Sequence, residues 1–199
     1  MSSRNSSLEM IKLGLILSLF AAASCTVLAL VNSVTSVKIA ENKIRKANEA
    51  MKVVMADADN FEPVENFAQS SNSSIKIQSV YSAKKKGTTI GAVAQINGPT
   101  YDRGTIMVGM AKDGTVTGVQ FLELSDSPGF GLKANDPTFF LPNGKTFYGQ
   151  FEGKNAKAGF KPGETFDAIS GATITSVGAA ALIEEGTKSM LQYLEGGAE

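Results

Sequence analysis

The stretch "IKIQSVYSAKKKGTTIGAVAQI", residues 75–96, combines β-favouring residues with a turn signal at its centre. Alternate positions of its first half would share one face of a strand: Ile75, Ile77, Ser79 and Tyr81. The second half, "TTIGAVAQI", continues in residues that favour strands after the "KKKG" turn. We therefore predict two neighbouring antiparallel strands that are joined by a short turn at residues 84–87.

A second strand–turn–strand pattern follows directly. "GTIMVGMA" and "TVTGVQFLEL" flank "KDG", in which Asp113-Gly114 is a two-residue turn signal. Strands joined by short turns indicate an antiparallel sheet. The segment "SDSPGFGLKANDPTFF", residues 125–140, then interrupts the pattern with prolines and glycines. We predict a further short strand in "KTFYGQFEGK", residues 145–154, and the end of another in "ETFDAI", residues 164–169.

Helices are predicted before and after these strands in the sequence. "SVGAAALIEEGTKSMLQYL", residues 176–194, has apolar or small residues at helical spacing: Val177, Ala180, Ile183, Thr187, Met190 and Leu194. "TSVKIAENKIRKANEAMKVVMA", residues 35–56, shows the same steps of three and four: Val37, Ala40, Ile44, Ala47, Met51 and Val54. Residues 56–74 lose this period and gather Asp, Asn, Pro and Ser, which is typical of a loop. The sequence thus indicates an α+β domain.

The segment "LGLILSLFAAASCTVLALV", residues 13–31, carries no charge and would form a helix about 28 Å long, close to the thickness of a bilayer core. Charges on both sides leave its orientation equivocal. A short basic N-terminus resembles an uncleaved signal anchor, with the larger part outside the cytoplasm. Two alternatives are a cleaved signal peptide and a lipoprotein box, "AAASC", ending at Cys25. Against both, the apolar run continues past Cys25.

These readings give four predicted segments and one predicted location. Residues 1–12 form a cytoplasmic N-terminus, residues 13–34 a transmembrane helix, residues 35–60 an amphipathic helix and linker, and residues 61–199 a single domain on the extracytoplasmic side. The membrane is the inner, cytoplasmic one, which the chain crosses once. The domain would have a mainly antiparallel sheet with flanking helices.

Composition excludes several classes of chemistry. The chain has no histidine, so Ser-His-Asp and Cys-His devices and most zinc sites are excluded. Its single cysteine cannot form an intramolecular disulfide or hold an iron–sulfur cluster by itself. Lys+Arg and Asp+Glu are both 19, so the net charge gives no reason to expect a nucleic-acid partner. We expect no metal site and no catalytic residue, and redox chemistry here would need an organic cofactor.

The stretch "DAISGATITS", residues 167–176, places small and hydroxylated residues before the predicted last helix. A helix start presents unpaired N–H groups and the positive end of a dipole, which favours a phosphate. Gly171 and Ala172 remove bulk, while hydroxyls are available to a ligand: Ser170, Thr173, Thr175 and Ser176. The alternative is that Thr175 or Ser176 only caps the helix.

The motif "DAISGAT", residues 167–173, resembles the Asp-x-x-(Ser/Thr)-Gly-Ala-Thr signature of domains that carry covalently attached FMN. "SDSPGFGLK", residues 125–133, is similar to the Glu-Thr-Pro-Gly-Leu-Gly loop of the same family. Asp126, Ser127 and Phe130 replace Glu, Thr and Leu, which leaves the Pro-Gly-x-Gly turn intact and puts only the contact of the acidic side chain in doubt.

The resemblance implies that the FMN phosphate is bonded to Thr173 as a phosphoester, installed by a Mg-dependent flavin transferase that uses FAD. Ser170, Thr175 and Ser176 would bond to the phosphate, beside Gly171 and Ala172, and Asp167 would order the turn or assist flavin transfer. The Pro-Gly loop would adjoin the flavin ring through Pro128, Gly129, Phe130, Gly131, Leu132 and Lys133. Phe130 and Leu132 are equally well explained as core residues, and Lys133 as an exposed lysine.

The order and size of the segments resemble the G subunits of Rnf-type ion-translocating ferredoxin:NAD oxidoreductases. The resemblance implies an electron-transfer subunit that works with the other membrane subunits of the complex and is anchored in the lipid bilayer. Three alternatives stay open: the homologous C subunit of the Na-translocating NADH:quinone reductase, which is usually longer; a membrane-anchored module that binds flavin non-covalently; and an ectodomain without a cofactor.

Overall fold

The computed structural model describes residues 3–196. The chain divides into two compact units, Met1–Arg45 and Lys46–Glu199. The first consists of most of helix α1 (Ser3–Val54), and the second contains the sheet and the C-terminal helix. Each unit is described on its own below.

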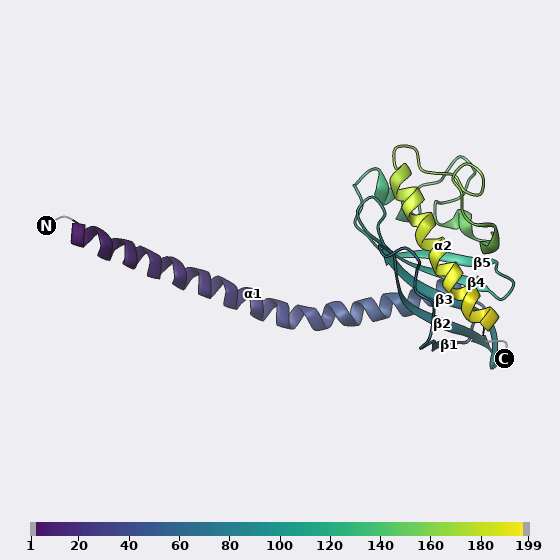
Figure 1. Cartoon of the computed structure of the whole chain (residues 1–199), viewed down its shortest axis with the longest axis horizontal. Helices are drawn as coiled ribbons and strands as arrows, with labels where there is room; N and C mark the ends of the chain where they lie inside the picture. Colours follow the sequence, from purple (N-terminus) through teal and green to yellow (C-terminus); the bar gives the residue numbers. More distant parts are fainter. Residues whose placement is uncertain (1–2, 197–199) are drawn as a thin grey trace. The chain divides into compact units, whose positions relative to one another are not determined.

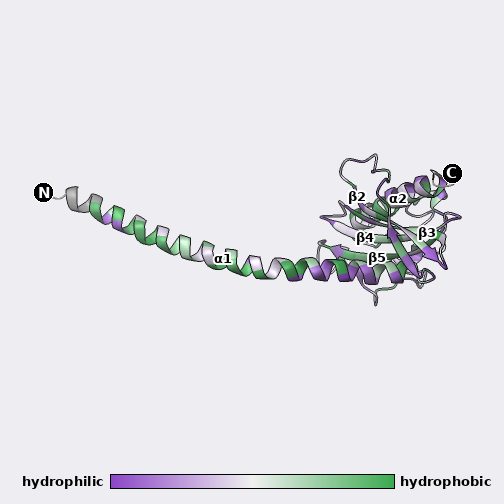
Figure 2. Cartoon of the chain, turned by 90° about the horizontal axis from the view of Figure 1, so that it is seen from below, coloured by the Kyte–Doolittle hydropathy of each residue, from purple (hydrophilic) through white to green (hydrophobic). Residues whose placement is uncertain are grey.

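Helix α1 contains a stretch that is long and apolar enough to cross a membrane, judged by length and composition. Figure 2 shows the apolar residues that dominate its N-terminal part and the hydrophilic residues that appear toward its C-terminal part. Hydroxyls in this stretch bond back to the helix itself: Thr26 Oγ1 donates to the Ala22 carbonyl at 2.8 Å, and Thr35 Oγ1 to that of Val31 at 2.8 Å. Such bonds satisfy polar groups where water is absent.

The predicted helix at residues 35–56 is the continuation of α1. Its apolar residues differ in their surroundings, because Val37 and Ile44 are exposed while Ala50, Met51 and Val54 are buried. Only the end of α1 is therefore part of the packed second unit.

The second unit is built on a five-stranded antiparallel sheet in the order β1-β2-β3-β4-β5. The strands are β1 (Asn60–Pro63), β2 (Lys76–Lys85), β3 (Thr88–Gly98), β4 (Gly104–Ala111) and β5 (Val116–Leu124). Helix α2 (Thr173–Gly196) lies across one face of this sheet (Figure 1). These elements confirm the predicted α+β fold with its antiparallel sheet and its apolar N-terminal helix.

Both predicted hairpins are present, and their turns differ. Lys86 and Gly87 have φ angles of 50° and 79°, so a two-residue turn of the left-handed kind joins β2 to β3. Between β4 and β5 the Ala111 amide donates to the Thr115 carbonyl, so the loop has three residues, with Gly114 at φ 89°. The expected two-residue turn at Asp113-Gly114 is thus a longer turn with glycine in its last position.

The alternation predicted for β2 is wrong beyond Ile77. A register shift between Ile77 and Ser79 inserts an extra residue, so Val80 joins Ile75 and Ile77 in the core beneath α2. Tyr81 then faces the opposite side of the sheet. A β-bulge exchanges the two faces of a strand, and strict period two cannot reveal it.

The loop predicted for residues 56–74 contains a strand. β1 pairs antiparallel with β2 at the edge of the sheet, with Pro63 at its end. Proline is tolerated there because an edge strand has one unpaired side.

Neither predicted strand after residue 140 forms. Residues 145–154 contain a 3₁₀ turn, Gly149–Phe151. Phe147, just before this turn, and Phe151 are both buried, and their rings meet edge to face with centroids 5.5 Å apart. Their four-residue spacing suits a helical turn and not a strand. At residues 164–169 only an isolated bridge, Pro162 to Phe166, is found. The backbone of Asp167 bonds instead to the Gln150 side-chain amide, at 2.7 and 3.0 Å.

The two faces of the sheet carry separate cores. α2 covers the larger one, where Ala179, Leu182, Ile183 and Met190 are buried against Ile96 and Ile106 among others. The end of α1 covers the smaller one, where Met51, Val54 and Met55 pack with Val93 and Met107. Of the residues predicted at helical spacing in α2, Val177 is 43% exposed and Leu194 is partly buried, and the others are buried: Ala180, Ile183, Thr187 and Met190.

Candidate functional site

The start of helix α2 gives each of its hydroxyls a different environment. The Ser176 hydroxyl is buried, donates to the Ala172 carbonyl at 3.0 Å and accepts from the Ile169 amide at 2.9 Å. Thr175 is also buried, and its hydroxyl bonds to the Asp126 carboxylate. Thr173, the first residue of the helix, is exposed. The local fold therefore occupies two hydroxyls and presents the third.

A glycine in a left-handed conformation leads into this helix. Gly171 has a φ of 78°, and a Cβ atom there would lie 3.2 Å from the Phe130 ring. A side chain at this position would be strained and would also crowd the ring. The motif "SGAT" thus brings Phe130 close to the turn that precedes Thr173.

The Pro-Gly loop forms the opposite side of the site. The amides of Phe130 and Leu132 both donate to the Ser127 carbonyl at 3.3 Å, which curls the loop into a 3₁₀ turn, Gly131–Asn135. A Cβ atom on Gly131 would lie 2.6 Å from Asp126 Cβ and 2.7 Å from Thr175 Oγ1. Only glycine therefore allows the loop to pack directly on the first turn of α2.

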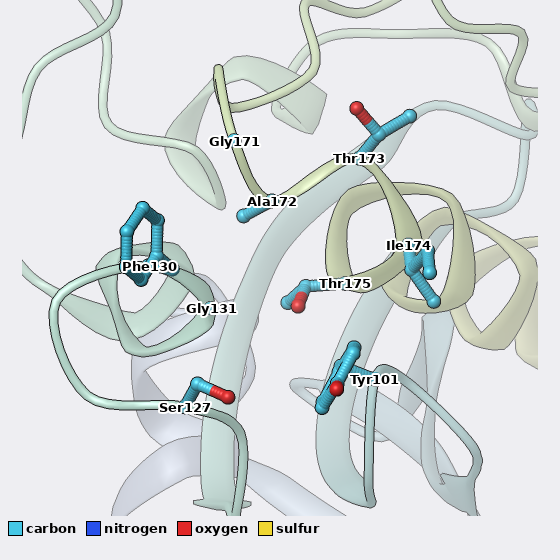
Figure 3. Close-up of a pocket in the computed structure, with 9 residues that line it drawn as sticks. All are labelled: Tyr101, Ser127, Phe130, Gly131, Gly171, Ala172, Thr173, Ile174 and Thr175. Carbon is cyan, nitrogen blue, oxygen red and sulfur yellow. The ribbon is translucent and has the colours of Figure 1, made fainter.

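Between these segments lies a pocket of about 440 Å³. Its lining comes from the Pro-Gly loop, from the start of α2 and from the loop before β4: Tyr101, Ser127, Phe130, Gly131, Gly171, Ala172, Thr173, Ile174 and Thr175 (Figure 3). Three of the apolar side chains are well exposed, Tyr101 at 63%, Phe130 at 57% and Ile174 at 62%. A pocket with an apolar lining and a few polar groups is typical of a small-molecule site.

Asp126 is buried and bonds to residues on two of the segments that line this pocket. Its side chain accepts from the Thr100 hydroxyl at 2.6 Å and from the amides of Asp102 and Tyr101 at 2.9 and 3.1 Å. Burial is the largest influence on the pKa of Asp126 and raises it, but the bonds from Thr100, Thr175 and the two amides together outweigh burial. The pKa is lowered overall, so the group is a carboxylate at neutral pH.

The structure brings together six of the thirteen residues predicted for the site: Phe130, Gly131, Gly171, Ala172, Thr173 and Thr175. The others do not line the pocket. Ser176 is buried, and the others in this group are exposed: Ser170, Pro128, Gly129 and Leu132. The Asp167 carboxylate accepts from the Asn143 amide at 2.8 Å. Lys133 Nζ lies 6.0 Å from the Phe130 ring centre and 5.2 Å from that of Phe139.

Sequence reasoning did not identify Tyr101, Ser127 and Ile174 as pocket residues. Ser127 and Ile174 are direct neighbours of predicted residues, so the two motifs contain them. No pattern around Tyr101 indicates that its loop reaches the site, because Asp126 brings it there through contacts distant in sequence.

The residues present fit an FMN molecule. The Phe130, Tyr101 and Ile174 side chains offer apolar surface to a ring system, and the start of α2 offers backbone N–H groups and the Thr173 hydroxyl to a phosphate. Gly171 keeps side-chain bulk away from the Phe130 ring, and Gly131 lets the Pro-Gly loop pack on Thr175.

Comparison with known proteins agrees with this geometry. The model of the FMN-binding domain matches residues 101–188, and the model of the RnfG N-terminal region matches residues 1–54. The fold and the site therefore define an FMN-binding-domain protein with an apolar N-terminal helix.

Relatives define the family more closely. The G subunit of the Na(+)-translocating ferredoxin:NAD(+) oxidoreductase complex of Acetobacterium woodii is 31% identical over 183 residues, which cover 83% of this chain and 84% of that protein. The G subunit of the ion-translocating oxidoreductase complex of Methanosarcina acetivorans is 28% identical, over 84% of this chain and 87% of that protein. The G subunit of the proton-translocating ferredoxin:NAD(+) oxidoreductase complex of Clostridium ljungdahlii is 25% identical, over 85% of each. The chain belongs to the RnfG family of G subunits of ion-translocating oxidoreductase complexes.

Proposed function

We propose that this chain is the flavin-carrying electron-transfer subunit of a membrane-bound ferredoxin:NAD oxidoreductase complex, with FMN attached through its phosphate to Thr173. The observation that carries the proposal is the exposed Thr173 hydroxyl at the start of α2, on the rim of a pocket of about 440 Å³. Family membership supports the complex, and the match to the FMN-binding domain supports the cofactor.

The choice of Thr173 as the attachment point is supported by its neighbours. Thr175 and Ser176 are buried and their hydroxyls are already bonded, whereas Thr173 is accessible to an enzyme that would transfer the flavin. Figure 3 shows the Thr173 side chain pointing outward from the helix start, away from Thr175. The Thr173 oxygen would bond to the flavin-side phosphorus of FAD and lose its proton as the pyrophosphate bond breaks and AMP leaves. The FMN phosphate would then lie at the positive end of the α2 dipole.

The remaining pocket residues would bind and orient the ring. FMN, when bound, accepts and donates electrons singly or in pairs. Phe130 and Tyr101 stand at opposite sides of the pocket and present aromatic surface, and Ile174 adds aliphatic surface on the side of Tyr101 (Figure 3). Lys133 is held against the Phe130 ring and places a positive charge beside the pocket, which would favour a reduced, anionic flavin.

We further propose that helix α1 anchors the chain once in the cytoplasmic membrane and that Lys46–Glu199 lies on the extracytoplasmic side. A phosphoester tether would prevent loss of FMN there. The lone cysteine and the absence of histidine leave the chain without another redox group of its own, so partner subunits of the complex would supply and remove electrons. The lipid bilayer and a flavin transferase are the other partners that we propose for this chain.

The attachment is tested by producing the full chain with a flavin transferase and precipitating it with acid. We expect the yellow colour and flavin fluorescence to remain with the wild-type protein and with Thr88→Ala, which removes an exposed threonine at the start of β3, far along the chain from the site. Thr173→Ala should lose both. Colour that moves to the supernatant for the wild type would contradict covalent attachment and favour a non-covalent flavin module.

A further inference from the structure

The carboxylate of Asp126 connects three segments that are far apart in the sequence. Its oxygens accept from the Thr100 hydroxyl and from the amides of Tyr101 and Asp102, which belong to the loop between β3 and β4. They also accept from Thr175 in the first turn of α2. Asp126 itself begins the Pro-Gly loop, so each bond ties that loop to one of the other two segments.

These three segments are the walls of the pocket. Tyr101 lines it from the first, Ser127, Phe130 and Gly131 from the second, and residues 171–175 from the third. Asp126 is not among the lining residues and is only 3% exposed. Gly131 packs against both Asp126 and Thr175 at distances that leave no room for a side chain. The walls therefore meet at one carboxylate.

Nothing else in the described part of the chain plays this part. Among the described side chains of residues 8–196, Asp126 is the one buried acidic group, and no lysine or arginine among them contributes to its pKa. Its charge is stabilised by hydroxyl and amide donors alone. A buried carboxylate without a cationic partner depends on those donors, and they in turn are held in place by it.

We propose that Asp126 is the positioning residue of the site: it fixes the Tyr101 loop and the Thr173 turn relative to the Pro-Gly loop, so that the attachment hydroxyl and the aromatic walls are held in the arrangement that accepts FMN. The effect of Asp126 on FMN attachment rests on the proposed function. Its effect on the positions of the pocket walls is a property of the protein without flavin. Asp126 acts through its neighbours and touches no ligand.

The charge state of Asp126 gives the proposal a signature. Its pKa is lowered by the donors that outweigh burial, so the carboxylate keeps its four bonds at neutral pH and loses acceptor capacity only on acidification. The titratable side chains on the segments packed around it are those of Tyr101, Asp102 and Arg103 on the loop and Lys133 on the 3₁₀ turn, and the first turn of α2 brings none. Asp102 is the other carboxyl among them.

The first experiment uses a reporter in the full chain without flavin. The sequence has no tryptophan, so Tyr101→Trp places a single fluorescent indole on the wall that Asp126 holds. In this background, we expect Asp126→Asn to lower the fluorescence anisotropy at neutral pH. Acid should lower the anisotropy of the parent and of the control Asp102→Asn, and change that of Asp126→Asn little. If acid lowered the anisotropy of Asp126→Asn by as much as it lowers that of the parent, the proposal would be overturned.

The second experiment measures the rate of FMN incorporation with limiting transferase. Thr100→Val removes one donor to Asp126 at nearly constant side-chain volume, and Thr100→Ser retains that donor. Neither Thr100 nor Asp126 lines the pocket. We expect about a tenfold slower incorporation in Thr100→Val, the loss typical of one bond to a charged group, and a rate close to wild type in Thr100→Ser. Equal rates in both variants would overturn the proposal, and so decide the matter if Asp126→Asn does not fold.

The two accounts fail in different ways. A wild-type chain that takes up no FMN would contradict the proposed function, and the reporter anisotropy would still test the role of Asp126. Two results together would contradict only the positioning role: a reporter anisotropy that Asp126→Asn does not change, and equal rates of FMN incorporation in Thr100→Val and Thr100→Ser.

Discussion

Gly131 shows how a single residue can determine the shape of the pocket. It stands where the Pro-Gly loop meets Asp126 and Thr175, and its missing side chain is what allows the loop to lie on α2. Gly171 plays the matching part opposite, in a left-handed conformation beside Phe130. The two glycines shape the pocket by different means: Gly131 allows close packing of the loop on α2, and Gly171 adopts a left-handed conformation.

We expect Gly131→Ala to destabilise the domain by about 1–3 kcal/mol, because the added methyl group would overlap Asp126 and Thr175. Gly196→Ala is a matched control, since a Cβ atom there meets nothing within 4 Å. Thermal unfolding of the two variants measures the difference. An unfolding temperature of Gly131→Ala equal to wild type would show that the loop yields without cost.

Asp126 also makes a prediction about acid stability. Its pKa is lower in the folded than in the unfolded chain, so its contribution to stability is present above about pH 4 and is lost as the pH falls through the folded pKa. We expect Asp126→Asn to cost about 1–3 kcal/mol at pH 7. The cost should shrink in acid.

Urea unfolding at neutral and acidic pH measures this difference. Glu185, whose pKa is also lowered, contributes acid dependence to both proteins and cancels in the comparison. A cost that is the same at both pH values would mean that the charge of Asp126 has no part in stability.

At the residue scale, the sequence predicted the position of Thr173 more fully than its surroundings. Small and hydroxylated residues before a helical pattern placed it at a helix start, where α2 does begin. The engagement of Thr175 by Asp126 and the presence of Tyr101 depend on contacts across about 25 to 50 residues of chain, which local patterns do not record. The predicted roles of the remaining site residues stay predictions.

At the scale of the elements, the end of α1 packs closely against the sheet. Gly109 on β4 and Gly118 on β5 are directly paired, and Val54 lies over both. A Cβ atom on Gly109 would lie 2.4 Å from the Val54 carbonyl oxygen, which also accepts from the Thr117 hydroxyl. These two paired glycines thus form the surface on which the last turn of this helix packs.

We expect Gly109→Ala to loosen this contact, since the added methyl group meets backbone atoms that cannot rotate away. The free energy of unfolding should fall by about 1–3 kcal/mol. Hydrogen exchange of residues 46–55 should become faster while that of α2 is unchanged. Gly87→Asn, in the exposed left-handed turn, is the control and should leave exchange at residues 46–55 as in wild type. Unchanged exchange in Gly109→Ala would contradict the account of this contact.

Element types were predictable where the pattern was long and regular. The hairpins and α2 follow from period two and period 3.6, and the sheet that they imply is present. β1 was missed because four residues ending in proline give no alternation. The strand expected at residues 145–154 does not form because its phenylalanines pack against each other around a 3₁₀ turn. The strand expected at residues 164–169 does not form because the Gln150 side chain bonds to the backbone of Asp167. The bulge in β2 needed the structure.

At the scale of the whole molecule, the chain combines an apolar helix with a domain that carries a candidate flavin site. The family assignment supports a membrane complex, and the side of the membrane on which the domain lies is our proposal. The single native cysteine lies within the apolar stretch of α1, which makes the chain well suited to labelling at introduced thiols.

Cysteine labelling in intact cells tests the proposed side. We expect Thr88→Cys, at an exposed position at the start of β3, to react with a membrane-impermeant maleimide without permeabilisation. Glu9→Cys, before the apolar stretch, should react only after permeabilisation. The wild-type chain gives the background from Cys25. The reverse pattern would place the domain in the cytoplasm.

The central claim is tested most directly by tandem mass spectrometry of the chain produced with a flavin transferase. Trypsin should release residues 158–188 as one peptide, because Lys161 is followed by proline, and this peptide contains Ser170, Thr173, Thr175 and Ser176. The account predicts an added mass of about 438 Da, that of FMN less water, with fragment ions that assign it to Thr173. An unmodified peptide, or the same mass assigned to another residue, would contradict it.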